Sequence, residues 1–125
     1  MQTIYNSKVK EILYTEKLKN GLTVMIIPKK GIQKKFIIWG THYGSNDNKF
    51  VVPGENDPIE VPKGVAHFLE HKMFEQENGK NSLDVLTSIG VNANAYTTND
   101  HTAYLFECSE NFHISQMKML KKKRE

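Results

Sequence analysis

His67-Phe68-Leu69-Glu70-His71 is the most informative stretch of this chain. On a helix, positions 67 and 71 lie one turn apart and point the same way, so two imidazoles can bind one metal ion. Glu70 follows His67 by three positions and shares that face, where a carboxylate can accept a proton from a metal-bound water. The H-x-x-E-H spacing is one of the sequence patterns found in zinc hydrolases. The stretch therefore predicts a metal-binding helix.

The helical wheel of this stretch separates polar from apolar residues. With His67 at 0°, Glu70 falls at about 300° and His71 at about 40°. The pattern predicts one apolar face for a core and an opposite face that carries both imidazoles and the carboxylate. The alternative is a solvated polar face with two incidental histidines. The expected core-facing residues, between about 100° and 240° on the wheel, are Val65, Phe68, Leu69 and Met73.

Length and composition bound the class of protein. The chain has 125 residues, enough for one domain with a real core. Its formal net charge is +3, and much of the excess lies at 121–124, so we expect no nucleic-acid partner. The chain has no apolar run of membrane-spanning length and no signal-peptide pattern, so we expect no membrane association. The single cysteine, Cys108, suits a reducing compartment and favours a cytoplasmic location.

The N-terminal half is expected to be rich in strands. Asn20-Gly21 predicts a tight hairpin between strands at 11–19 and 22–28, because both central positions of such a turn need positive φ. Residues 35–43 form a third candidate strand, and its centre is apolar on both faces, which predicts a place inside a sheet. Residues 44–61 are rich in turn-forming residues, and we expect a loop there.

The second half alternates between helix and strand signals. The helix with the histidines follows Pro62, and a short helix is expected from about Ser82 to Ile89, with Asn81 as its cap and Gly90 after its end. Residues 91–97 and 102–107 are expected to form a second strand pair. In the first strand of this pair, Ala93, Ala95 and Thr97 share one face, and Asn92, Asn94 and Tyr96 share the other.

The order of these elements predicts a fold class. A weakly amphipathic segment begins near Ser109 and ends in a charge run. Strands followed by helices, and then strands again, predict an α+β domain with helices layered on one face of a mostly antiparallel sheet.

Four stretches, in order, carry a resemblance to a known family. The chain resembles the N-terminal part of the pitrilysin/insulysin-type (inverzincin) zinc metallopeptidases, and most of all a bacterial processing-peptidase-like member. The resemblance covers residues 10–112. It implies a metallohydrolase-like domain. The matching stretches are Asn20–Val24, Tyr43–Ser45, Gly64–Phe74 and Asn94–Tyr104.

The resemblance assigns roles to five residues. It implies a zinc ion held by His67 and His71, with Glu70 as general base for peptide-bond hydrolysis by metal-activated water. It also implies that Asn94 and Ala95 lie on the strand that pairs with an extended peptide or small protein substrate. Without the resemblance, Asn94 is better explained as an exposed strand or turn residue. Affinity order alone leaves cobalt and manganese open in place of zinc.

The third metal ligand is missing from the expected set. A catalytic zinc site takes three protein ligands and one open position. The resemblance implies a later glutamate, further from the motif than the 54 residues that follow His71. We therefore expect residues 1–125 to be the N-terminal portion of a peptidase domain, incomplete at the C-terminus, with a poorly matched basic tail at 113–125. A homologous second half or partner subunit is implied as well.

Local substitutes for this ligand are weak candidates. Glu75 lies about 12 Å from His67 along a helix axis, too far for one metal to bridge easily. Glu77, Asp100 and His101 are possible but have no further support in the sequence. Two hypotheses follow. The first is a zinc-dependent metalloendopeptidase, present as a truncated chain that cleaves peptides poorly or not at all by itself. The second is a non-catalytic protein, either a peptide-binding or partner subunit or an inactive fragment.

Overall fold

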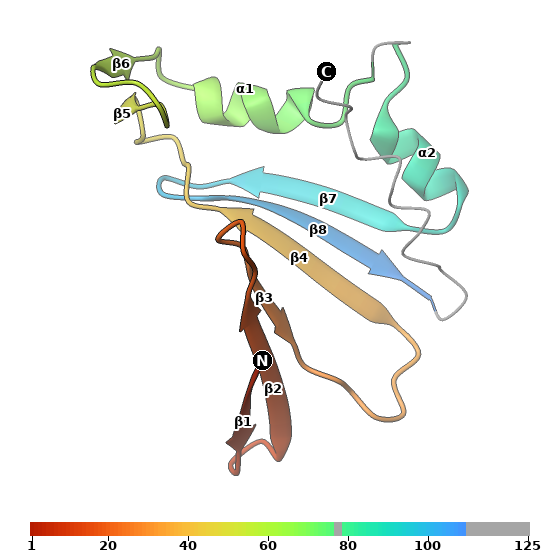
Figure 1. The fold of residues 1–125 in the computed structure, drawn as a ribbon. Helices are drawn as coiled ribbons and strands as arrows, with labels where there is room; N and C mark the ends of the chain where they lie inside the picture. The colour runs from red at the N-terminus through yellow and green to blue at the C-terminus, as the bar shows by residue number, and fades with distance from the viewer. Residues whose placement is uncertain (77–78, 110–125) are drawn as a thin grey trace. The chain divides into compact units, whose positions relative to one another are not determined.

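The computed structural model of this protein describes residues 1–76 and 79–109. The expected segment beyond residue 109, with the tail at 113–125, lies outside the described residues. The chain divides into two compact units, Met1–Ile32 and Gln33–Glu125, which we describe separately. Figure 1 shows the elements, which are β1 (Gln2–Asn6), β2 (Glu11–Lys17), β3 (Thr23–Ile26), β4 (Lys35–Thr41), β5 (Lys49–Val51), β6 (Pro58–Glu60), α1 (Val65–Lys72), α2 (Ser82–Ser88), β7 (Asn92–Thr97) and β8 (Thr102–Cys108).

The first unit is an antiparallel sheet in the order β1-β2-β3. The expected hairpin is confirmed as β2–β3: β2 begins at residue 11 as expected but ends two residues earlier, and β3 is shorter than expected at both ends. Its turn is wider than the two-residue turn that the sequence predicts, because Leu18 and Leu22 close it with a backbone hydrogen bond of 2.8 Å. Among its residues only Gly21 has positive φ, at 88°. β1 was not expected, since all five of its residues are exposed and it carries no apolar pattern.

The second unit contains an antiparallel sheet in the order β4-β8-β7. Its central strand, β8, is buried over most of its length. The prediction that β4 lies inside a sheet was wrong for the described residues, because β4 is an edge strand there, and Phe36 and Ile38 are 62% and 55% exposed. The core comprises Phe74, Leu86, Val91, Tyr104, Phe106 and Cys108.

The expected loop at 44–61 contains a small hairpin instead. β5 and β6 pair with Phe50 opposite Ile59 and Val51 opposite Pro58. Pro58 is the first residue of its strand, a position where the missing N–H of proline is tolerated. Turn-forming residues around Gly54 mask this hairpin in the sequence, because the two strands have only three residues each.

The two helices form where the sequence predicts them, and both contact β7 (Figure 1). Asn81 caps α2 by accepting a hydrogen bond of 2.8 Å from the backbone N–H of Leu83. Gly90 has positive φ directly after Ile89, the C-cap residue of α2, as expected for a glycine at this position. Within the described residues, no helix is long and apolar enough to cross a membrane.

α1 contacts the sheet through a different face from the expected one. The residues that it buries are Ala66 and Glu70, and Phe74 continues the same line one turn further. The prediction of the core-facing stripe was therefore wrong, because a small side chain and a hydrogen-bonded carboxylate approach the sheet more closely than the bulky apolar ones. The exposed stripe consists of Phe68, Leu69 and Met73, which are 58%, 46% and 50% exposed.

Candidate metal centre

The two histidines of α1 lie side by side at the helix surface. Their Nε2 atoms are 3.0 Å apart, and their ring centroids are 4.8 Å apart. Nitrogen ligands of one tetrahedral zinc ion, each 2.0–2.1 Å from the metal, are about 3.3 Å apart. Both side chains are exposed, so the site is open to an ion. The pair therefore has the separation and the access that a shared metal requires.

Glu70 lies between α1 and the sheet and is only 7% exposed. Its Oε2 accepts a hydrogen bond of 2.7 Å from the hydroxyl of Thr97 on β7. Burial, and after it the negative charge of Glu70, raises the pKa of the neighbouring Tyr104 hydroxyl above its ordinary value. The carboxylate is thus held in a partly dry site on the helix side of the sheet.

These three residues form one candidate ligand group. One ligand atom from each of His67, Glu70 and His71 lies within 4.8 Å of the other two. Among residues 1–76 and 79–109, no other group of three or more such side chains is found. Two imidazoles and a carboxylate fit the ligand chemistry of zinc, whereas magnesium and calcium prefer oxygen ligands.

The possible substitutes for the third ligand do not join this group. Glu75 forms an ion pair with Lys72. Asp100 and His101 interact with each other at 2.7 Å in the turn between β7 and β8. Glu77 lies outside the described residues. In the part of the chain that the structure describes, the centre is therefore formed by two histidines with an adjacent glutamate.

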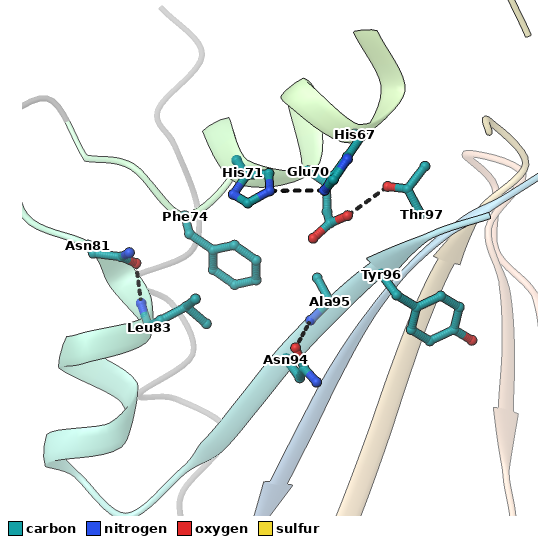
Figure 2. A pocket seen from close by; sticks show the side chains of 10 residues that line it. All are labelled: His67, Glu70, His71, Phe74, Asn81, Leu83, Asn94, Ala95, Tyr96 and Thr97. Carbon is teal, nitrogen blue, oxygen red and sulfur yellow. Dashed lines mark hydrogen bonds between the residues drawn. The ribbon is translucent and has the colours of Figure 1, made fainter. Parts of the chain in front are cut away.

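A cavity of about 440 Å³ connects this centre to β7. It brings together all five residues singled out from the sequence, although Asn94 and Ala95 come from a different element than the motif (Figure 2). β7 is an edge strand of its described sheet. The lining residues are His67, Glu70, His71, Phe74, Asn81, Leu83, Asn94, Ala95, Tyr96 and Thr97.

The backbone of β7 presents a polar group at this edge. The N–H of Ala95 donates a hydrogen bond of 2.9 Å to the side-chain Oδ1 of Asn94 (Figure 2). The burial of β7 alternates as expected, with Ala93, Ala95 and Thr97 half-buried. Sequence reasoning placed Thr97 on this face but missed its contact with Glu70. Its position two residues after Ala95, on the same face, was the available signal.

The comparison with known families agrees with this geometry. The sequence profile of the Insulinase (Peptidase family M16) family matches residues 56–121, which is more than half of the chain and includes α1, α2, β7 and β8. The chain belongs to this family. The resemblance to insulysin-type peptidases that the sequence suggests is confirmed.

The chain is also similar to parts of several longer proteins. It is 45% identical over 111 residues to a Bacillus subtilis protein named uncharacterized zinc protease YmfH, covering 89% of this chain and 26% of that one. It is 38% identical over 58 residues to the mitochondrial ubiquinol-cytochrome-c reductase complex core protein I of Euglena gracilis, covering 44% and 12%. The crystal structure of an M16-like peptidase from Alicyclobacillus acidocaldarius matches with a TM-score of 0.71 and 38% identity, covering 81% of this chain and 23% of that one. The chain thus spans about a quarter of the length of two of these three proteins.

Proposed function

We propose that this chain is the metal-binding, N-terminal part of a zinc-dependent metalloendopeptidase. The observation that carries the proposal is the 3.0 Å separation of the two Nε2 atoms on α1, with the buried Glu70 carboxylate beside them. Relatives named zinc proteases support zinc as the cofactor. We also propose that the domain has the layered α+β, metallohydrolase-like fold that the sequence suggests.

The residues of the centre divide the chemistry of hydrolysis among them. His67 and His71 would hold the ion through their imidazole nitrogens. Zinc, when bound, supplies a Lewis acid that polarises the scissile carbonyl and lowers the pKa of water. Glu70 accepts a proton from the attacking water and passes it to the leaving amine. The cavity beside β7 holds the peptide bond near these groups.

We propose that the substrate is a peptide or small protein that binds as an extra strand along the edge of β7. The Ala95 N–H already has an acceptor in Asn94 Oδ1, and a carbonyl of an extended peptide can take that place. Main-chain pairing gives affinity without strong dependence on side chains, so we expect loose sequence preference.

The isolated chain is expected to cleave peptides poorly or not at all. A catalytic zinc site takes three protein ligands, and the candidate group of the described residues offers two histidines and the glutamate assigned here as the base. The Bacillus relative and the Alicyclobacillus structure are each about four times as long as the segment that they match, so a homologous second half or partner subunit is the proposed source of the remaining groups.

The alternative is a non-catalytic peptide-binding or partner subunit, or an inactive fragment. It is favoured by the Euglena relative, whose name describes a core protein of the ubiquinol-cytochrome-c reductase complex. The two functions differ in one property: a peptidase site binds metal and peptide at the same place, whereas a partner subunit has no such requirement.

Binding of a peptide that ends in a hydroxamate group distinguishes these functions. The hydroxamate chelates zinc, so the measurement does not require the chain to cleave the peptide. The affinity of the chain for this compound is measured with and without zinc, beside the same peptide with a carboxamide end. The proposal predicts that zinc strengthens binding of the hydroxamate only, and that His67→Ala with His71→Ala removes the gain. Equal binding of both peptides, indifferent to zinc, indicates the peptide-binding alternative. If neither peptide binds, the result indicates an inactive fragment.

A further inference from the structure

The Glu70 carboxylate is oriented by one neighbouring hydroxyl. Thr97 Oγ1 donates to Oε2 of Glu70 at 2.7 Å, from a strand that lies opposite the helix. Figure 2 shows the other carboxylate oxygen, Oε1, pointing away from Thr97 and toward the side of the cavity where Ala95 lies. One oxygen is therefore fixed to the sheet, and the other faces the cavity.

A second threonine hydroxyl lies beside that of Thr97. Thr102, opposite Thr97 in the β7–β8 register and 2% exposed, has its Oγ1 3.3 Å from that of Thr97. The Thr102 hydroxyl also donates to the backbone carbonyl of Tyr43 at 2.9 Å. Thr97 is thus bonded to the buried carboxylate, and Thr102, packed behind it, is bonded to a backbone carbonyl.

The count of protons fixes the direction of both hydroxyls. An ionised carboxylate and a carbonyl oxygen only accept hydrogen bonds, and each threonine has one hydroxyl proton. The proton of Thr97 is therefore directed to Glu70, and the proton of Thr102 to Tyr43. The contact between the two Oγ atoms is left without a proton, so neither hydroxyl can rotate toward the other without losing its acceptor.

The residues that follow Tyr43 are anchored by backbone contacts. The N–H groups of Ser45 and Asn46 donate to the carbonyls of Thr98 and Asn99 at 2.9 and 3.0 Å. Gly44 packs so closely on this turn that an added Cβ would lie 2.4 Å from the Asp100 nitrogen. The segment that carries the Tyr43 carbonyl therefore has little freedom to move relative to β7 and β8.

We propose that Thr97 is a positioning residue for Glu70, with Thr102 packed behind it. The inference rests on the proposed function, because orienting this carboxylate matters for hydrolysis only if Glu70 is the general base. By holding Oε2, Thr97 leaves Oε1 free to accept the proton of the attacking water. It also supplies the hydrogen bond that a buried carboxylate needs. Positioning of Glu70 explains why a threonine stands at position 97, a feature that metal binding by His67 and His71 does not explain.

The first test observes Glu70 directly in the metal-free chain. The side-chain carboxyl 13C resonance of Glu70 is measured in Thr97→Val, which keeps the shape and removes the hydroxyl, and in Thr97→Ser, which keeps the hydroxyl. We expect the valine variant to shift the resonance and the serine variant to restore it. Thr98→Val is the matched control, because the Thr98 hydroxyl bonds Asp100 and not Glu70. An unshifted resonance in a folded Thr97→Val chain contradicts the proposal.

Thr97→Ala keeps the test decisive if Thr97→Val fails to fold, as judged by circular dichroism. This smaller side chain also lacks the hydroxyl, so the Glu70 resonance is expected to shift in the same direction. An unchanged resonance in a folded Thr97→Ala chain contradicts the proposal.

The second test links positioning to the proposed chemistry. Hydroxamates transfer their acidic proton to the general base when they chelate zinc, so their affinity reports the placement of Glu70. We expect Thr97→Val to lower the zinc-dependent hydroxamate affinity about tenfold, as for loss of a hydrogen bond to a charged group. Zinc affinity should stay unchanged. Carboxamide binding is measured in the same variant, and an equal loss there would mean that Thr97 acts on peptide binding and not through Glu70. If the unmodified chain shows no zinc-dependent gain, the proposed function fails, whereas the 13C resonance still decides whether Thr97 holds Glu70.

Discussion

Gly44 and Asp100 approach each other so closely that a Cβ on Gly44 would lie 2.4 Å from the Asp100 backbone nitrogen. The contact joins the end of the β4 segment to the turn between β7 and β8, more than fifty residues later. Next to it, the Ser45 N–H donates to the Thr98 carbonyl at 2.9 Å, one residue after the Thr97 that contacts Glu70.

Gly44→Ala should therefore destabilise the protein. The added methyl group meets backbone atoms, which cannot rotate away, and overpacking of this kind costs about 1–3 kcal/mol. The free energy of unfolding in urea measures the effect. Gly40→Ala is the matched control, since its nearest neighbour is 4.0 Å away and its stability should change little. Equal stability of both variants would show that the Gly44 contact is looser than described.

The acid stability of the chain should depend on Asp100. Hydrogen bonds from His101, and after it Thr98, lower the pKa of this carboxyl below its ordinary value of 3.8. The folded pKa is lower than the unfolded one, so the carboxylate stabilises the fold above the unfolded pKa. That contribution is lost as the pH falls through the folded pKa.

Asp100→Asn removes this pH-dependent contribution. The melting temperature of the unmodified chain should fall more steeply below pH about 4 than that of the variant. Asp57→Asn, at an exposed position, is the control and should follow the unmodified chain. Identical pH profiles of all three proteins would refute the assignment to Asp100.

Some of this site could be predicted from the sequence, and the reasons are local. The helix, its two histidines and its glutamate follow from a spacing of one helical turn, and the Asn81 cap follows from a side chain that bonds the nearby Leu83 N–H. The alternation along β7 likewise places Asn94 and Ala95 on opposite faces.

Other features depend on contacts between distant parts of the chain. The buried face of α1 carries Glu70 because Thr97, 27 residues later, supplies a hydrogen bond, and no helical wheel shows that partner. β1 has only exposed residues and forms by pairing with β2, so its own pattern gives no signal. The hairpin around Gly54 is hidden by turn-forming residues that also occur in loops.

Asn94→Ala should weaken peptide binding at the β7 edge. The Asn94 amide is exposed beside the cavity and offers one acceptor and two donors to an extended peptide. Loss of one such hydrogen bond corresponds to a weakening of about two- to tenfold. Calorimetry with the carboxamide peptide measures it. Asn92→Ala is the control on the same face of β7, and equal affinities of the two variants would remove Asn94 from the site.

The exposed stripe of α1 should cause the isolated chain to associate. Phe68, Leu69 and Met73 are about half exposed along one side of the helix, and clustered apolar surface of this kind promotes association. Phe68→Ser with Leu69→Ser should shift sedimentation toward the monomer at the same concentration. Lys63→Ser, at an exposed position before the helix, should leave sedimentation unchanged. An unaltered sedimentation profile of the double variant would mean that another surface drives association.

The most direct test of the central claim is a zinc-binding isotherm of the purified chain near neutral pH. We predict one zinc ion per chain, lost when His67→Ala and His71→Ala are combined and kept in His42→Ala, a histidine outside the candidate group. Zinc binding that is indifferent to the paired substitution would contradict the assignment of α1 as a metal centre.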